Sequence, residues 1–151
     1  METHVNPIPQ GYHSLTPYLM VEEADRALEF YKKAFGAKEI MHTKTPHGEI
    51  GHCEMQIGDS RFMFSGLFGN MEKSHPNSSS SLLIYVDNVD EFFKRALSAG
   101  AIEISPVTDQ FYGDRMGSLK DPFGHLWHIG THVENVSPEE MQKRAQEKWK
   151  H

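Results

Sequence analysis

An internal repeat constrains the fold of this chain more than any other feature of its sequence. Val21 and Val86 each close a strand-like run, and they stand 65 positions apart. Gly36 and Gly100 each follow an amphipathic helical pattern, and they stand 64 positions apart. Self-similarity at a constant spacing indicates that one supersecondary unit is used twice. We therefore expect two similar modules within the 151 residues.

Each half of the chain carries four strand patterns and one helical pattern, in the order strand, helix, strand, strand, strand. The helical stripe of residues 24–35 places Ala27, Leu28 and Tyr31 on one side, and Gly36 follows where a helix-ending glycine belongs. The predicted strands are 15–21, 38–45, 48–57 and 60–66 in the first half, and 81–86, 102–108, 114–120 and 125–132 in the second half, whose helix is 89–99. The expected fold class is α+β, with tandem βαβββ modules forming a curved, cleft-enclosing mixed sheet, plus a C-terminal helix.

The segments outside the modules are short. Residues 1–13 contain two prolines and a glycine and are predicted to form an extended N-terminal arm. Ser137 and Pro138 open the C-terminal helix as an N-cap and an N1 proline. The predicted organisation is an arm 1–13, a single domain 14–132 made of modules 14–66 and 81–132, a linker 67–80, and a helical tail 133–151. The linker is either a mobile connection or a lid over a pocket.

The composition argues against several classes of partner. The net charge of −6 gives no electrostatic support for binding nucleic acid or an anionic membrane. The first residues lack the basic and apolar regions of a signal peptide, and no apolar run approaches the ~18 residues of a membrane span. Cys53 is the only cysteine, so no intramolecular disulfide can form. We expect a cytoplasmic protein with neither a nucleic acid nor a membrane as its partner.

Histidines fall on predicted strands in positions that point away from the helices. In strand 48–57, His52 and Glu54 share one face while Cys53 and Met55 share the other, because successive side chains of a strand alternate. His128 faces the same way in the last strand. Aromatic and apolar residues surround these polar groups on the predicted cleft side, and such a mixture is typical of a small-molecule site.

Tyr112 and Arg115 precede or open a predicted strand and allow two interpretations. An arginine beside an aromatic ring can hold an anionic or carbonyl substrate with its planar guanidinium group. Asp114 and Arg115 can equally form turn and ion-pair contacts that only support the fold. The sequence leaves both interpretations open.

Several motifs extend over residues 11–141. They are Gly51-His52-x-Glu54, Asp109-Gln110-Phe111-Tyr112-Gly113-Asp114-Arg115, Asp121-Pro122-Phe123-Gly124-His125-x-Trp127, and the run from Thr131 to Glu140. With the tandem βαβββ pattern, they resemble the vicinal oxygen chelate superfamily, which includes glyoxalase I, extradiol dioxygenases and bleomycin- and fosfomycin-resistance proteins. Within it, the chain is similar to the PhnB-like, glyoxalase-like branch.

The resemblance also implies where a metal would bind. Metal-dependent members take one ligand from each of four strands, usually two histidines and two glutamates. The four positions fall on Thr16, Met63, Ser81 and His128 in this sequence. Hydroxyls are weak ligands at neutral pH and a thioether is soft, so three of the four are not ordinary ligands for a divalent metal. The resemblance therefore implies the fold without carrying over the usual metal site.

Two functions of different classes follow. The first is a protein that binds a small organic molecule, planar or hydrophobic, in the cleft between the modules, with no cofactor. Its predicted pocket residues are Thr16, Tyr18, His52, Glu54, Met63, Ser81, Tyr85, Tyr112, Arg115 and His128. The alternative is a metal-dependent lyase or dioxygenase with a divalent metal at a rebuilt site of His52, Glu54 and His128. A homodimer is expected, with the C-terminal helix reaching toward the partner.

Overall fold

The computed structural model describes residues 5–67 and 79–150, which belong to two compact units divided between residues 74 and 75. That division lies inside the predicted linker 67–80, and most of the segment interpreted as a linker or lid lies outside the described residues. The order of elements is strand, helix and three strands, twice, followed by a helix. The predicted tandem βαβββ architecture and α+β fold class are confirmed.

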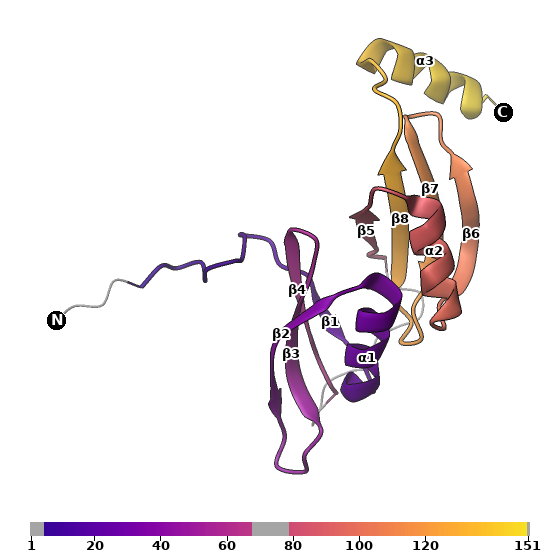
Figure 1. Cartoon of the computed structure of the whole chain (residues 1–151). Coiled ribbons are helices and arrows are strands. Elements are labelled where there is room, and N and C mark those ends of the chain that lie inside the picture. Colours follow the sequence, from indigo (N-terminus) through magenta and orange to yellow (C-terminus); the bar gives the residue numbers. More distant parts are fainter. Residues whose placement is uncertain (1–4, 68–78, 151) are drawn as a thin grey trace. The chain divides into compact units, whose positions relative to one another are not determined.

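The first unit is a four-stranded sheet with one helix against it (Figure 1). Its elements are β1 (Tyr18–Met20), α1 (Ala24–Phe35), β2 (Lys38–Lys44), β3 (Ile50–Ile57) and β4 (Ser60–Ser65). The strand order is β1-β4-β3-β2, and only the β1–β4 pair is parallel. The two edges of the sheet are therefore β1 and β2.

The core of the first unit lies between α1 and its sheet. Tyr31 of the helix is fully buried and makes an edge-on ring contact with Phe64 of β4. Met55 of β3 is fully buried with them. Gly36 ends the helix with a φ of 64°, a left-handed conformation that glycine adopts without a steric penalty. The 3.6-residue apolar period of α1 thus matches the face that it buries.

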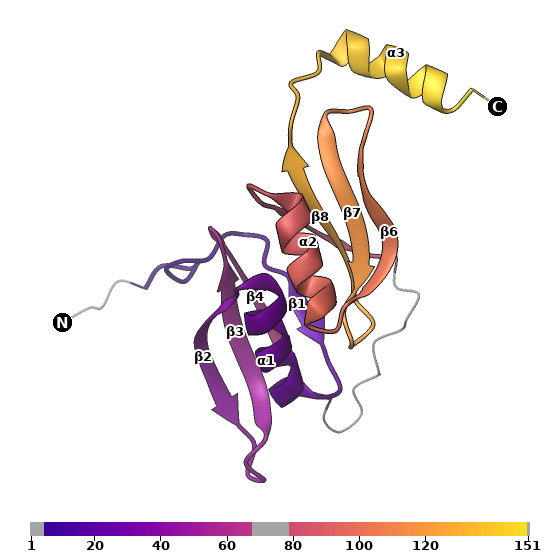
Figure 2. The ribbon, with the colours of Figure 1, turned by 45° about the vertical axis from the view of Figure 1, so that its right-hand side comes forward.

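The second unit repeats this plan (Figure 2). Its elements are β5 (Leu82–Tyr85), α2 (Val89–Ser98), β6 (Ile102–Asp109), β7 (Asp114–Lys120) and β8 (Leu126–His132), and the tail helix α3 (Pro138–Lys148) follows them. The strand order is β5-β8-β7-β6, with a parallel β5–β8 pair. Asn88 caps α2 by accepting a hydrogen bond of 3.2 Å from the backbone N–H of Glu91.

The strand registers confirm the sequence repeat residue by residue. Tyr18 is opposite Met63 in the β1–β4 pair, and Leu83 is opposite His128 in the β5–β8 pair. Each member of the second pair stands 65 positions after its counterpart in the first. The repeat therefore covers strand pairing as well as the order of elements.

The turn between β7 and β8 is organised by a buried carboxylate. Asp121 is 2% exposed, and its Oδ1 accepts hydrogen bonds of 2.9 Å from the backbone N–H groups of Phe123 and His125. Its Oδ2 accepts one of 2.9 Å from Trp127 Nε1. A buried carboxylate needs such partners, since an unpaired one would lose its hydration without compensation. This network explains the Asp-Pro-Phe-Gly-His-x-Trp motif as a structural device.

Two strands begin two or three residues later in the structure than the sequence pattern predicts, and the other strand ends agree to within one residue. The first begins at Tyr18 rather than at residue 15, because Pro17 has no N–H to donate and contributes only its carbonyl, which accepts from Met63 N at 3.0 Å. The third begins at Ile50 rather than at residue 48, since Gly48 has a φ of 87° and belongs to the preceding turn. Both differences arise at strand ends beside a proline or a glycine, where boundaries are hardest to place from a pattern.

The tail helix α3 has no buried residue and is held mainly by polar contacts. Arg144 pairs with Glu134 at 2.9 Å and donates to the carbonyl of Phe111 at 3.1 Å. The ring of Trp149 meets that of Phe111 edge-on, with 5.6 Å between centroids.

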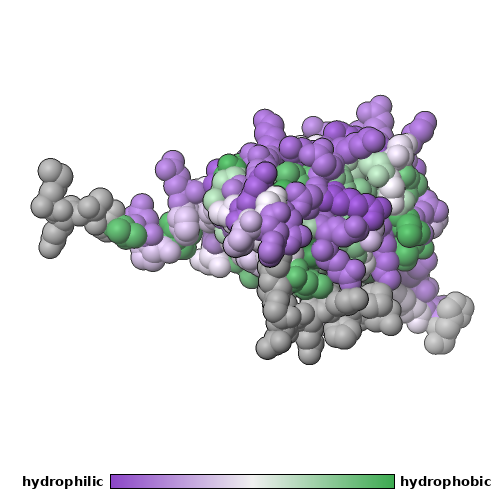
Figure 3. Space-filling model, turned by 90° about the horizontal axis from the view of Figure 1, so that it is seen from below, coloured by the Kyte–Doolittle hydropathy of each residue, from purple (hydrophilic) through white to green (hydrophobic). Residues whose placement is uncertain are grey.

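Hydrophilic residues cover much of the face drawn in Figure 3, and hydrophobic residues form separate patches on it. Among the described residues, no helix is long and apolar enough to cross a membrane.

Candidate functional site: the distal faces of the two sheets

Each sheet has a face that points away from the helix of its own unit, called here the distal face. The predicted alternation in β3 is confirmed, since Cys53 and Met55 are buried on the helix side while His52 and Glu54 are half-buried. Burial raises the pKa of the Cys53 thiol to about 12, with the charge of Glu39 adding to the effect. The chemistry available to the first unit therefore lies on its distal face.

Four side chains of the first unit form a hydrogen-bonded chain on this face. His52 Nε2 lies 2.9 Å from Glu54 Oε2, and the other ring nitrogen lies 3.1 Å from the hydroxyl of Tyr18. The remaining oxygen of Glu54 accepts a hydrogen bond from Tyr12, which belongs to the N-terminal arm. The chain thus runs from Tyr18 through His52 and Glu54 to Tyr12.

The surroundings of Glu54 favour its ionised form. Burial alone would raise the pKa of Glu54, but the hydrogen bonds from Tyr12 and His52, with the charges of His52 and Arg61, together hold it below its ordinary value. Burial and the adjacent carboxylate raise the pKa of Tyr12 to about 12. Arg61 lies over the Tyr12 ring, 5.2 Å from its centroid, and donates to the carbonyl of Gln10 at 3.3 Å. These contacts fasten residues 10–12 of the arm to the sheet.

The distal face of the second unit carries a different group. His128 Nδ1 lies 2.6 Å from the hydroxyl of Ser118 on β7, and Nε2 lies 3.0 Å from the hydroxyl of Ser81 before β5. The strand pairing produces this arrangement, because Ser118 is directly opposite His128 and Leu83 flanks it on the other side. The imidazole is therefore bracketed by two neutral hydroxyls.

A cavity of about 320 Å³ opens beside this imidazole within the second unit. Its walls come from β6, the β6–β7 turn, β7 and β8, and they consist of Ser105, Pro106, Thr108, Gln110, Tyr112, Met116, Gly117, Ser118 and His128. The hydroxyl of Tyr112 lies 3.6 Å from the sulfur of Met116. The volume is at the lower end of the range for small-molecule sites.

A buried aspartate closes one end of the same sheet. Asp114 is 4% exposed, and its two oxygens accept hydrogen bonds from the Tyr85 hydroxyl at 2.6 Å and from His132 Nδ1 at 2.8 Å. The other ring nitrogen of His132 lies 2.8 Å from Asn135 Oδ1. The hydrogen bond with Asp114, followed by that with Asn135, raises the pKa of His132. Tyr85 is thus engaged with the aspartate, while Tyr112 lines the cavity.

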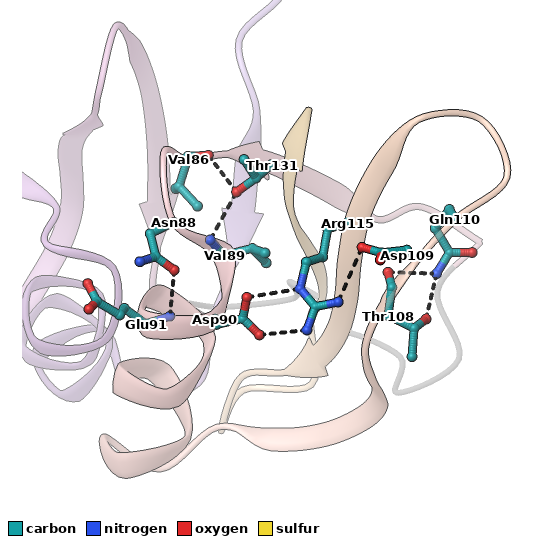
Figure 4. Close-up of polar contacts among 10 residues, drawn as sticks. All are labelled: Val86, Asn88, Val89, Asp90, Glu91, Thr108, Asp109, Gln110, Arg115 and Thr131. Carbon is teal, nitrogen blue, oxygen red and sulfur yellow. Dashed lines mark hydrogen bonds and ion pairs between the residues drawn. The ribbon is translucent and has the colours of Figure 1, made fainter. Parts of the chain in front are cut away.

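Arg115 takes the ion-pair role that the sequence left open. Its guanidinium group donates two hydrogen bonds to the carboxylate of Asp90, in the first turn of α2 (Figure 4). Nε lies 2.9 Å from Oδ2, and Nη2 lies 3.0 Å from Oδ1. It also pairs with Asp109 at 3.2 Å. Arg115 alternates along β7 with the cavity residues Met116 and Ser118, and it contacts the helix of the unit. The prediction that Arg115 belongs to the ligand pocket stays a prediction, and these ion pairs argue against it.

The comparison with known families is decisive for the fold. The family model of the Glyoxalase/Bleomycin resistance protein/Dioxygenase superfamily matches residues 11–129. The chain belongs to this superfamily. The similarity spans both units and ends within β8, so it covers nearly all of the tandem architecture.

Individual proteins are also similar to this chain, in sequence or in structure. An uncharacterized protein of Mycobacterium bovis is 35% identical over 136 residues, which cover 85% of this chain and 90% of the relative. The crystal structure of TioX from Micromonospora sp. ML1 matches with a TM-score of 0.64 and 24% identity, over 83% of this chain and 100% of TioX. A PhnB protein from Bacillus cereus matches with a TM-score of 0.63 and 20% identity, over 79% of this chain and 99% of that protein.

The superfamily's four metal positions fit a metal poorly in this member. Thr16 donates its hydroxyl to the carbonyl of His13 at 3.3 Å, and Met63 offers only a thioether. Ser81 and His128 are bonded to each other. One imidazole, two hydroxyls and a thioether do not match the nitrogen and carboxylate oxygen set that an open divalent site uses. Within residues 5–67 and 79–150, no three His, Cys, Asp or Glu side chains gather in a way that could hold a metal.

The structure groups the other predicted site residues by unit. Tyr18, His52 and Glu54 meet in the first unit, and Ser81 and His128 meet in the second. The residues predicted from the sequence did not include Tyr12, which lies in the segment predicted to be an extended arm, or Ser118. The alternation of β7 opposite His128 could have found Ser118, but no sequence signal connects Tyr12 with Glu54, 42 positions away.

Proposed function

We propose that this protein binds a small organic molecule, that the cavity of the second unit is its site, and that binding needs no four-ligand metal centre. The observation that carries this proposal is the convergence of His128, Ser118 and Tyr112 on one cavity with Met116 in its wall. A few oriented polar groups in a partly apolar hollow are the usual composition of a ligand site. The poor metal fit of Thr16 and its three counterparts supports the same proposal.

We propose that the protein belongs to the PhnB-like branch of the superfamily. The turn motif that begins at Asp121 and the motif of residues 109–115 support this proposal, as does the shared fold with the Bacillus cereus PhnB protein. Fold similarity by itself does not specify chemistry, so the function rests on the cavity rather than on the branch.

A fragment screen tests the proposed function. The full-length protein is screened by thermal shift against a library of small aromatic compounds, and hits are mapped by amide chemical-shift changes. We expect hits whose shifts include Ser118 and His128, and we expect His128→Ala to weaken them. Ser60→Ala, in the first unit, is the matched control and should bind as the wild type does. Hits that never perturb the cavity residues would contradict the proposal.

The His52–Glu54 pair supports a second candidate, a metal-dependent lyase or dioxygenase. An imidazole and a carboxylate 2.9 Å apart on a distal face are two of the donor groups that such a site needs. Elemental analysis of tag-free protein after dialysis against Ni²⁺, Zn²⁺ or Mn²⁺ tests it. About one metal per chain, lost in His52→Ala, would favour this function.

Size-exclusion chromatography with light scattering tests the expected homodimer separately.

A further inference from the structure

We propose that the cavity of the second unit selects uncharged molecules that carry a carbonyl, amide or heteroaromatic group, and that Ser118 and His128 recognise this group through a hydrogen-bond relay of reversible polarity. The inference rests on the proposed function, because it specifies the ligand class of the same cavity. Three observations lead to it: the chemistry of the walls, the engagement of the neighbouring charges, and the two partners of His128.

The cavity walls contain no permanently charged side chain. All nine lining residues belong to the described part of the second unit, and none of them is Asp, Glu, Lys or Arg. They offer hydroxyls, one amide and one imidazole, together with a thioether and a proline ring. An ionised ligand that entered such a site would lose hydration and find no opposite charge in these walls. A neutral ligand loses less and can still be fully hydrogen-bonded.

The charged residues at the start of β7 are already engaged. Arg115 is held by Asp90 and Asp109, as Figure 4 shows. Asp114 accepts hydrogen bonds from Tyr85 and His132. Lys120, at the other end of β7, is not among the lining residues. Neither Asp114 nor Arg115 is therefore poised to compensate a charge on a bound molecule.

His128 has a hydroxyl on each ring nitrogen, and within residues 5–67 and 79–150 no carboxylate is among its hydrogen-bond partners. A neutral imidazole has one donor and one acceptor nitrogen, and a serine hydroxyl can complement either of them. If Nδ1 carries the proton, it donates to the Ser118 oxygen, and the Ser118 hydroxyl is free to donate into the cavity. If Nε2 carries the proton, it donates to Ser81, and Ser118 donates to Nδ1 while its oxygen accepts from the cavity.

The relay therefore offers a ligand either a donor or an acceptor at the same position. A carbonyl oxygen selects the first arrangement and a ring or amide N–H selects the second. No side chain has to move in either case, because only hydroxyl protons and the imidazole tautomer change. An amide or a lactam presents both functions and can therefore bind through either of them.

An isosteric series tests the charge preference. The probes are 2-naphthamide, 2-naphthoate and 2-naphthamidine, which share a planar ring system and differ in charge. Each is titrated into the full-length protein at pH 7.5 and followed by amide chemical shifts. We expect 2-naphthamide to perturb Ser118, His128 and Tyr112, with a dissociation constant at least about tenfold lower than either charged probe shows. An equal or tighter fit of 2-naphthoate or 2-naphthamidine in this cavity would overturn the charge preference while leaving the proposed function standing.

Two variants separate the relay from the cavity itself. Ser118→Ala removes the relay hydroxyl, whereas Ser105→Ala removes a hydroxyl of the directly paired position on β6, outside the relay. Ser118→Ala should weaken 2-naphthamide about tenfold, and Ser105→Ala should weaken it less. Equal losses in both variants would overturn the relay. If no probe perturbs any cavity residue, both the inference and the proposed function fail.

Discussion

His52 and Glu54 stand two positions apart on β3, and His52 Nε2 lies 2.9 Å from Glu54 Oε2. Strand alternation alone places these side chains on one face, so their pairing is local in origin. The same carboxylate also accepts a hydrogen bond from Tyr12, 42 positions earlier. Glu54 is thus, with Arg61, one of the residues that join the N-terminal arm to the first sheet.

Tyr12→Phe should raise the pKa of Glu54, because it removes one of the hydrogen bonds that hold this pKa down. A depressed carboxyl pKa contributes stability above the unfolded value of 4.5, and this stability is lost as the pH falls through the lower folded value. The variant should therefore unfold at a higher pH on acidification, and the free energy of unfolding at pH 7 should fall by about 1 kcal/mol. Carboxyl ¹³C NMR titration and acid unfolding measure both effects.

Tyr18→Phe is the control for this variant, since it removes a hydroxyl that contacts His52 rather than Glu54. It should change the pKa of Glu54 less than Tyr12→Phe does. A Tyr12→Phe protein whose Glu54 titrates as in the wild type would show that the arm does not hold the carboxylate in solution.

Asp114→Asn should lower the pKa of His132, because the hydrogen bond with that carboxylate is the largest cause of the raised value. A raised histidine pKa contributes stability that is fully present below the unfolded value of 6.5 and is lost as the pH rises through the folded value. The wild type should thus lose this contribution as the pH rises from 6.5 through the raised folded value, and the variant should lack it. NMR titration of the imidazole C–H signals measures the pKa. Asp109→Asn, which removes a partner of Arg115, should leave the pKa of His132 unchanged.

Gly113→Ala should destabilise the second unit more than Gly100→Ala does. Both glycines have positive φ, 101° and 120°, so alanine is strained at each. A Cβ at position 113 would lie 2.2 Å from the carbonyl oxygen of Glu134, whereas one at position 100 meets nothing within 4 Å. We expect losses of about 1–2 kcal/mol for Gly100→Ala and at least about 3 kcal/mol for Gly113→Ala. Urea unfolding measures the difference, and equal losses would contradict the close approach of the tail.

Asp121→Ala should destabilise the second unit by about 3 kcal/mol, because it leaves the Trp127 indole N–H and two backbone N–H groups without this acceptor. Tryptophan fluorescence during urea unfolding measures the loss. The exposed Asp87, changed to alanine, is the control and should cost little. A loss below about 1 kcal/mol would mean that the turn forms without its buried carboxylate.

The local pattern of this sequence determined most of the architecture. The apolar period of residues 24–35, the alternation of β3 and the 65-residue offset of Val21 and Val86 predicted the elements, the buried faces and their repetition. These features depend on residues close in sequence, so a pattern can express them. Even the direction of His52 and Glu54 followed from the period of a strand.

Contacts between distant residues were decided only by the tertiary structure. Tyr12 is hydrogen-bonded to Glu54, and Ser81 is hydrogen-bonded to His128. Arg115 pairs with Asp90 and does not line the cavity. Each of these pairs joins elements that are separated along the chain, and hydrogen bonds form wherever folding brings a donor within reach of an acceptor. The sequence determines which side of a strand a group faces, whereas the packing of strands, turns and arms determines which partner it meets there.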